Sequence, residues 1–207
     1  MYLRTEGVIL KRKNFGEADR IVTFYTRDYG KVTALAKGVR RPSSKKAGHI
    51  ELGNWCKVFV ARGKNLDLLT EVEAKYAFGI DEFTETKANR IYHILELVDA
   101  LTPEHQKNLQ VFILLVQFLK KCAHEEDFSL LASVFKVKLL ANLGFFSAKS
   151  ASAASTQNFL ESLEFDDYEK IKSKFKLSAK ANLKLLLFLD SMVENLTQQK
   201  LRTSKFL

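Results

Sequence analysis

The chain has 207 residues, and 33 Lys and Arg against 24 Asp and Glu give it a formal net charge of +9. With 46% hydrophobic and 28% charged residues, its composition is that of a globular protein with a sizeable core and excludes a disordered chain. Its longest uninterrupted apolar run is six residues, Val111–Val116, whereas a membrane helix needs roughly 20.

The two cysteines, Cys56 and Cys122, are too few for a disulfide framework and have no CxxC or CxH neighbour. We therefore expect an intracellular protein without a metal or another cofactor. The excess of positive charge predicts an acidic partner without naming it.

Charge and glycine both divide the chain near residue 79. Residues 1–76 hold 16 basic and 8 acidic side chains, a net +8, whereas residues 77–207 hold 17 and 16, a net +1. Eight of the nine glycines lie in the first 79 positions, where they punctuate short segments. We therefore predict two domains of different fold, 1–79 and 80–207.

The first domain contains five β-type segments separated by turn signals. Val32, Ala34 or Leu35, and Ala36 alternate with polar residues in the third segment, which is typical of a strand with one face in a core. Five short strands within so few residues favour a closed barrel, and the OB-fold is the commonest five-stranded design. The predicted strands are Thr5–Lys13, Ile21–Thr26, Lys31–Lys37, Trp55–Arg62 and Leu66–Tyr76.

Basic residues cluster at the strand ends and in the polar connection before the fourth strand. Cations suit phosphates, and the aromatic rings interleaved among them suit unstacked bases, so the cluster predicts single-stranded nucleic-acid binding. The alternative is that an aromatic such as Phe24 packs in the core and that each lysine is simply solvated. The cations are Lys11, Arg12, Lys13, Arg20, Lys37, Arg40, Arg41, Lys45 and Lys46, and the aromatics are Phe15, Phe24, Tyr25 and Tyr29.

The second domain has helical periodicity, and its alternative reading is a purely structural bundle. Asp127 and Ser178 are expected N-caps, and Gly144 a C-terminal stop. The predicted helices are Thr84–Leu101, the buried central Leu109–Ala123, Phe128–Leu143, one or two within Asn158–Lys176, and Ser178–Leu196. The polar segment 147–157 is expected to be a loop, and the last helix is expected to bury Leu183, Leu186, Leu187 and Met192.

No catalytic constellation is apparent in the sequence. The four histidines have no HxxxH or HxH spacing, and neither a phosphate-binding glycine loop nor a GxSxG elbow is present. We therefore expect a binding protein rather than an enzyme.

An ordered series of motifs resembles the RecO family of bacterial recombination mediators. The matching stretches are EGVIL, FGEADRIVTFYT, the YGK turn, AKGVRR with the following SSK, LDLLTEVE at 66–73, and the terminal KLRTSKFL. The resemblance implies an N-terminal OB-fold followed by an all-helical domain. It also implies a cytoplasmic protein that binds single- and double-stranded DNA, anneals complementary strands, and works with RecR to load RecA onto DNA coated by single-strand binding protein.

The resemblance further implies that the helical part binds the acidic tail of single-strand binding protein. Lys120, Lys121, Lys136 and Lys138 are candidates for that contact, although ordinary solvated lysines are an equal alternative. Many family members carry a four-cysteine zinc ribbon near the position of residues 146–157, but residues 146–176 contain no cysteine, so no zinc is expected here.

The nine cations are expected to form a track for DNA phosphates, with Arg40 and Arg41 the strongest candidates because arginine binds phosphate in a bidentate manner. Two alternatives stay open: an RNA-binding OB-fold module, and an adaptor whose basic face docks an acidic protein.

Overall fold

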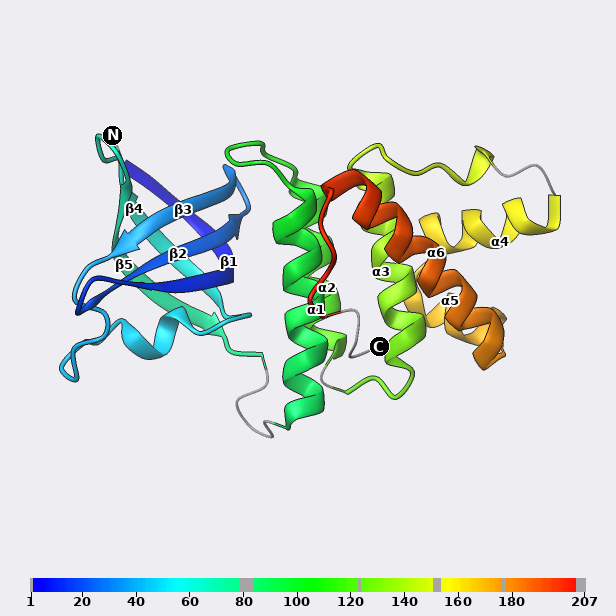
Figure 1. Ribbon diagram of the computed structural model, residues 1–207, viewed down its shortest axis with the longest axis horizontal. Coiled ribbons are helices and arrows are strands. Elements are labelled where there is room, and N and C mark those ends of the chain that lie inside the picture. Colours follow the sequence, from blue (N-terminus) through cyan, green and yellow to red (C-terminus); the bar gives the residue numbers. More distant parts are fainter. Residues whose placement is uncertain (1, 79–83, 123, 151–153, 176–177, 204–207) are drawn as a thin grey trace. The chain divides into compact units, whose positions relative to one another are not determined.

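The computed structural model describes residues 2–78, 84–122, 124–150, 154–175 and 178–203. The chain forms two compact units, Met1–Ala123 and His124–Leu207 (Figure 1). The predicted boundary at residue 79 lies outside the described residues, between the last strand, which ends at Tyr76, and the first helix, which begins at Glu85. The first compact unit extends further than the predicted first domain, because it includes the first two helices as well as the five strands.

Five strands form a closed barrel in the order β1-β2-β3-β5-β4, in which β3 and β5 are parallel and the other pairs antiparallel. This arrangement confirms the predicted OB-fold barrel followed by helices. The strands are β1 (Tyr2–Phe15), β2 (Asp19–Thr26), β3 (Gly30–Ala36), β4 (Trp55–Ala61) and β5 (Asp67–Tyr76), and a short 3-10 helix, η1 (Ala47–Ile50), precedes β4.

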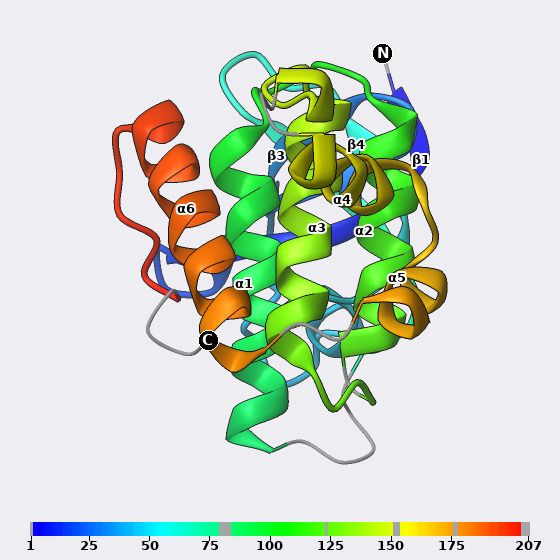
Figure 2. The same ribbon diagram turned by 90° about the vertical axis from the view of Figure 1, so that its right-hand side faces the viewer.

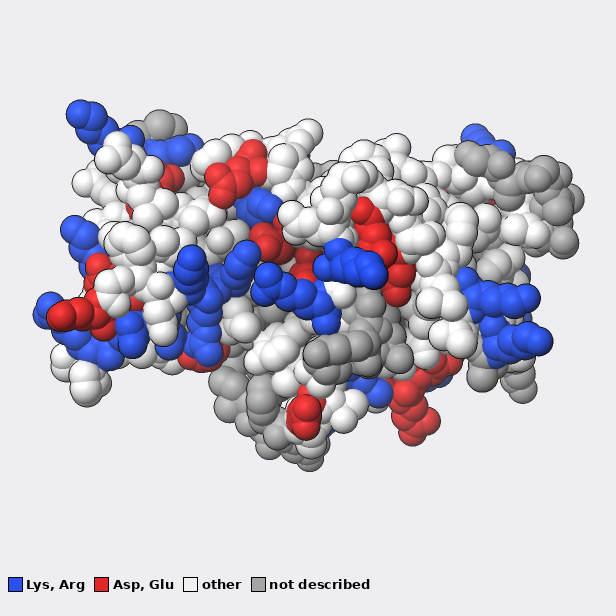
Figure 3. Space-filling view, viewed as in Figure 1, with Lys and Arg blue, Asp and Glu red and all other residues white. Residues whose placement is uncertain are grey.

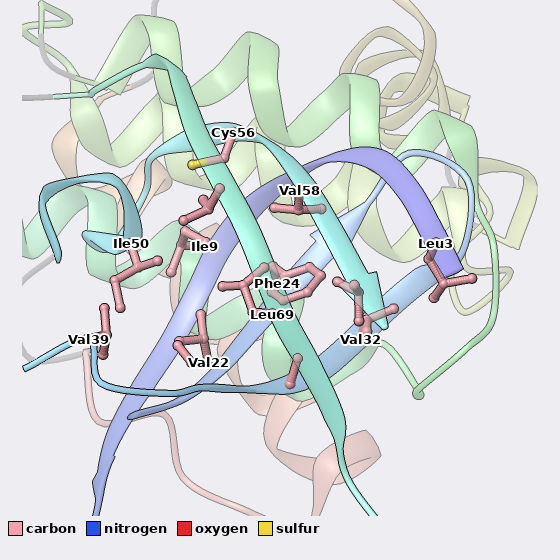
Figure 4. Packing of buried hydrophobic residues seen from close by; sticks show 14 residues of the cluster. Leu3, Ile9, Val22, Phe24, Val32, Val39, Ile50, Cys56, Val58 and Leu69 are labelled. Atoms are coloured by element: carbon pink, nitrogen blue, oxygen red, sulfur yellow. The ribbon is translucent and has the colours of Figure 1, made fainter. Parts of the chain in front are cut away.

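Strand β1 is long because it serves two neighbours. Residues 2–8 pair with β4 and residues 7–15 pair with β2, so Gly7 and Val8 have a partner on each side. The pairing with β2 shifts register between Ile9 and Lys11. Such a bulge bends the strand and redirects the side chains that follow it. The barrel interior is filled by alternate apolar side chains from all five strands, among them Leu3, Phe24 and Val58 (Figure 4).

Two helices, α1 (Glu85–Leu101) and α2 (Leu109–Cys122), complete the first unit. The chain between them lies against β2 and β3: the Tyr25 hydroxyl donates to the carbonyl of Asn108 (3.3 Å), and the His105 amide donates to the carbonyl of Lys31 (2.8 Å). Gly30, at φ +67°, faces the backbone of Gln106 so closely that a Cβ would lie 2.1 Å from its carbonyl oxygen.

The second unit is built around α3 (Phe128–Asn142), whose side chains from Phe128 to Val137 are buried except Ser129, which is half-buried. Helices α4 (Ala154–Phe165), α5 (Tyr168–Lys174) and α6 (Ala179–Thr197) pack against it, with α5 and α6 on different sides (Figure 2). A short 3-10 helix, η2 (Ala148–Ser150), precedes α4. None of the described helices is long and apolar enough to span a membrane.

The predicted caps Asp127 and Ser178 are confirmed, since each side chain accepts a hydrogen bond from the amide three residues on. Two expectations are wrong. The predicted loop 147–157 gives way to α4 from Ala154 onward, because small residues such as Ala and Ser are compatible with a helix. In α6 only Leu186 of the four expected core residues is buried; Leu183 and Leu187 are exposed, and Met192 is half-buried. The other buried side chains that the structure describes in this helix are Asn182, Leu189 and Val193.

Helix α2 is also less buried than expected of a central helix. Leu109 and Ile113 are more than a third exposed, although its remaining apolar side chains are buried. The helix therefore has one open flank.

Candidate nucleic-acid interface

Strand pairing gathers the predicted cations at one end of the barrel. Asn14 lies opposite Arg20 at the junction of β1 and β2, and Arg20 lies opposite Ala36 at the end of β3. The last residues of β1, the first of β2 and the connection that follows β3 therefore meet. Lys and Arg side chains gather over this part of the molecule, with some acidic ones among them (Figure 3, left).

The connection after β3 is fastened to the β1–β2 turn by hydrogen bonds. The Gly38 amide donates to the Asp19 carboxylate (2.7 Å), and the Arg40 amide donates to the carbonyl of Ala18 (2.8 Å). The Arg40 guanidinium also donates to the carbonyl of Gly16 (3.2 Å). Arg40 and its neighbour Arg41 thus project from a fixed backbone, which reduces the entropy lost when they bind a ligand.

Six of the nine predicted cations are exposed, and we call this set the basic track. Its members are Lys11, Lys13, Lys37, Arg40, Arg41 and Lys45. Lys11 is loosely paired with Asp99 of α1 at 3.8 Å while its side chain stays 66% exposed. All six side chains are therefore accessible to an anionic ligand, although Lys11 and Arg40 each also have one contact within the protein.

The other three predicted cations are held by the protein itself. Arg12 forms a hydrogen-bonded ion pair with Glu51, and Arg20 lies 4.0 Å from the same carboxylate and donates to the Asn14 side chain (3.3 Å). Lys46 donates to the carbonyl of Leu69 (3.4 Å). Sequence reasoning missed Glu51, because a lone acid 39 residues from Arg12 carries no local signal.

Two of the four aromatic residues among the predicted cations are buried, which confirms the core alternative for Phe24. Phe24 and Tyr25 are fully buried, and burial raises the pKa of the Tyr25 hydroxyl to about 12. Tyr29 is half-buried, and Phe15 alone of the four is exposed, at 51%. Of these four rings, only that of Phe15 is therefore exposed enough to stack on a base.

The outer surface of β2 and β3, where OB-folds commonly bind oligonucleotides, is partly covered in this chain. Lys31 donates to the carbonyl of Asp99 (2.6 Å), and Thr33 donates to the Glu104 carboxylate (2.7 Å). Asp99 near the end of α1 and Glu104 in the α1–α2 connection thus lie over one half of that surface. Apart from the loose Lys11–Asp99 pair, no contact of these two acids reaches the basic track among the described residues.

The four lysines predicted for a protein partner lie in both compact units. Lys120 is exposed, with its ammonium group 5.5 Å from the centre of the Trp55 ring, and Lys121 is half-buried. Lys138 is half-buried and donates to the carbonyl of Glu164 (3.0 Å). Lys136 has no exposed surface; it is paired with Asp190 at 2.5 Å, and burial lowers its pKa against the opposing effect of that carboxylate. Lys136 therefore offers nothing to a partner.

The cysteines do not fit a zinc site. Cys56 in β4 and Cys122 in α2 are both buried, and burial raises the pKa of each thiol to about 12. Among the described residues, no three His, Cys, Asp or Glu side chains are grouped as metal ligands would be. A four-cysteine ribbon has no counterpart in this chain.

Similarity to known proteins covers both parts of the molecule. Residues 1–78 match the family described as "Recombination protein O N terminal", and residues 90–195 match "Recombination protein O C terminal". Proteins named "DNA repair protein RecO" are similar in sequence. That of Pelotomaculum thermopropionicum is 32% identical over 69% of this chain and 55% of its own length. That of Symbiobacterium thermophilum is 35% identical over 68% and 56%. The chain thus matches about half the length of these relatives.

Proposed function

The chain belongs to the RecO family, and from this premise we propose that it is a DNA-binding recombination mediator in recombinational DNA repair. It binds single- and double-stranded DNA through the barrel and anneals complementary strands. It acts by binding rather than by chemical catalysis.

The observation that carries this proposal is the basic track itself. Six exposed cations from the end of β1 and the connection after β3 converge at one end of the barrel, although up to 34 positions separate them in sequence. Neutralising the phosphates of two strands lowers their mutual repulsion, so that complementary bases can meet and pair. Phosphate contacts of this kind do not select a sequence, as a mediator requires.

The track also sets the expected salt dependence. If each of its six cations neutralises one phosphate of a single strand, the logarithm of the association constant falls against the logarithm of salt concentration with a slope of about −4. A slope near zero contradicts the proposal.

Further partners complete the proposed role. With RecR, the chain helps RecA load onto DNA that is coated by single-strand binding protein. The acidic tail of that protein is expected to contact the exposed Lys120, with Lys121 and Lys138 as half-buried candidates.

The decisive experiment measures annealing of complementary oligonucleotides by the full chain, with and without single-strand binding protein. The double variant Arg40→Glu, Arg41→Glu is expected to lose most of the acceleration and most of its affinity for DNA. Lys180→Glu, Lys184→Glu is the matched control, because it makes the same change in net charge at exposed residues of α6. Equal losses in both variants, or no acceleration by the unmodified chain, would overturn the proposal.

A further inference from the structure

A second surface of the barrel, away from the basic track, has the chemistry to bind nucleobases. It is the outer side of β1, β4 and β5, whose inward side chains, among them Leu3, Val58 and Leu69, fill the barrel (Figure 4). Outward side chains from these three strands line a groove of about 410 Å³, which is the size of a small-ligand pocket. We call this surface the aromatic face; its residues are Tyr2, Arg4, Lys57, Phe59, Glu71 and Glu73.

Two aromatic rings are stacked on this face and one of them is open to solvent. The rings of Tyr2 and Phe59 are nearly parallel, with 10° between their planes and 5.4 Å between their centres. Tyr2 is 65% exposed although one side of its ring lies on Phe59, so the other side is free. A flat, exposed ring on a sheet is the feature on which unpaired bases stack.

Strand register arranges three kinds of group beside the rings. Arg4 of β1 lies opposite Phe59 of β4, and Phe59 lies opposite Glu71 of β5. Adjacent strands are about 4.8 Å apart, so a cation, a ring and a carboxylate follow one another across the face. The cation suits a phosphate, the ring suits the base, and the carboxylate accepts from an amino group on the edge of the base.

Charge separates this face from the basic track. Its two cations, Arg4 and Lys57, are balanced by Glu71 and Glu73, and the Lys57–Glu73 pair is loose, at 3.9 Å with both side chains mostly exposed. A duplex, whose bases are stacked and paired, gains nothing from such a face. Carboxylate acceptors favour cytosine over thymine, because thymine has no amino group.

We propose that the aromatic face is a second DNA-binding site, one that takes unpaired bases of single-stranded DNA and prefers cytosine to thymine. The inference rests on the proposed function, because it assumes that DNA is the ligand of the barrel. It goes beyond that function in giving single strands a site that duplexes do not use, on a surface that shares β1 with the basic track.

The test measures equilibrium binding of the full chain to labelled oligomers of about 20 nucleotides, dC and dT, and to a duplex of similar length. The unmodified chain is expected to bind the dC oligomer more tightly than the dT oligomer. Tyr2→Ser is expected to weaken both single-strand affinities about tenfold and to leave duplex affinity unchanged, since stacking contributes ~1–3 kcal/mol per base. Glu71→Val is expected to abolish the preference for the dC oligomer. If it instead strengthens binding to both oligomers equally, Glu71 only repels the phosphates, and the proposed contact with cytosine is contradicted.

Controls separate this proposal from the proposed function. Phe165→Ser removes a similarly exposed ring from α4 and is expected to leave all three DNA affinities unchanged. Phe59→Leu repeats the test should Tyr2→Ser lower the melting temperature. If both Tyr2→Ser and Phe59→Leu bind all three DNAs as the unmodified chain does, the aromatic face is not a DNA site, and a protein partner is then favoured. An equal loss on duplex and single strands also overturns the proposal. In both cases the proposed function is tested separately, by the DNA affinity of the double variant Arg40→Glu, Arg41→Glu. If the unmodified chain binds no DNA, both proposals are overturned.

Discussion

At the scale of single residues, Glu51 neutralises part of the positive charge that, under the proposed function, the barrel offers to DNA. Its carboxylate holds Arg12 and lies 4.0 Å from Arg20. A phosphate has the same charge and the same bidentate geometry toward arginine, so under the proposed function Glu51 competes with DNA for these two side chains.

Replacing Glu51 with Gln is therefore expected to strengthen DNA binding severalfold and to make the single-strand salt slope steeper by about one, because Arg12 and Arg20 become available. The measurement is a salt titration of affinity. Glu17→Gln is the matched control, since it removes one charge from the exposed β1–β2 turn at the same end of the barrel. An identical gain in both variants would mean that net charge, and not the release of arginines, sets the affinity.

Gly30 is a second residue whose local geometry has consequences for the fold. Its φ of +67° disfavours a side chain, and the Gln106 backbone occupies the space that a Cβ would need. Gly30→Ala is expected to lower the free energy of unfolding by about 2–4 kcal/mol, through combined strain and overpacking. Gly16→Ala, at φ +57° with no atom within 4 Å of its added Cβ, is expected to cost about 1 kcal/mol. Denaturant unfolding of both variants checks the difference, and equal costs would refute the steric explanation.

At the scale of elements, α6 is held to α3 by polar as well as apolar contacts. Lys136 of α3 pairs with Asp190 of α6, and Ser133 lies 3.4 Å from the Asn182 side chain. The Lys136 ammonium group is entirely buried and Asp190 only slightly exposed, so either group would be costly without the other.

We expect Lys136→Met to lower the free energy of unfolding by about 3 kcal/mol, because it leaves the Asp190 carboxylate in a largely buried position. The double variant Lys136→Met, Asp190→Leu is expected to recover most of that loss, as buried ion pairs often tolerate apolar replacement. A double-mutant cycle measured by chemical denaturation tests both statements. If the double variant is as unstable as the two single changes added together, the pair is not the reason that Lys136 is buried.

The elements themselves could be predicted well from the sequence, but the buried side of α6 could not. Strand alternation and the caps Asp127 and Ser178 are local signals, and the observed boundaries follow them to within a few residues. In α6, apolar residues surround much of the helix, so periodicity alone does not say which side faces α3. Asn182 and Asp190 mark that side, because their partners on α3 are buried polar groups.

At the scale of the whole molecule, the charge distribution along the sequence predicted the region that carries the basic track. It did not predict that α1 and the α1–α2 connection pack over β2 and β3. The Tyr25 hydroxyl donates to the carbonyl of Asn108, 83 positions along the chain, and no local sequence pattern connects the two residues. The aromatic face also escaped prediction, because Tyr2 and Phe59 meet only through the pairing of β1 with β4.

Because side chains on the outer surface of the barrel are buried within the first unit, we expect that the barrel does not fold stably without α1 and α2. Val8 and Tyr25 lie opposite each other on β1 and β2, outside the set of side chains that fill the barrel, and both are fully buried. Leu10, at the bulge, is also buried. A fragment ending at residue 79 would expose these three side chains to water, at a cost of about 5 kcal/mol or more, comparable to the whole stability of a small domain.

A fragment of residues 1–123 is therefore expected to unfold in one cooperative transition, whereas residues 1–79 alone are expected to be largely unfolded or to bind hydrophobic dyes. Urea unfolding followed by circular dichroism and by fluorescence of Trp55, the only tryptophan in the chain, gives the comparison. Coincident transitions in the longer fragment would establish two-state behaviour. Equal stability of the two fragments would mean that Val8, Leu10 and Tyr25 contribute little, and that the barrel is a domain on its own.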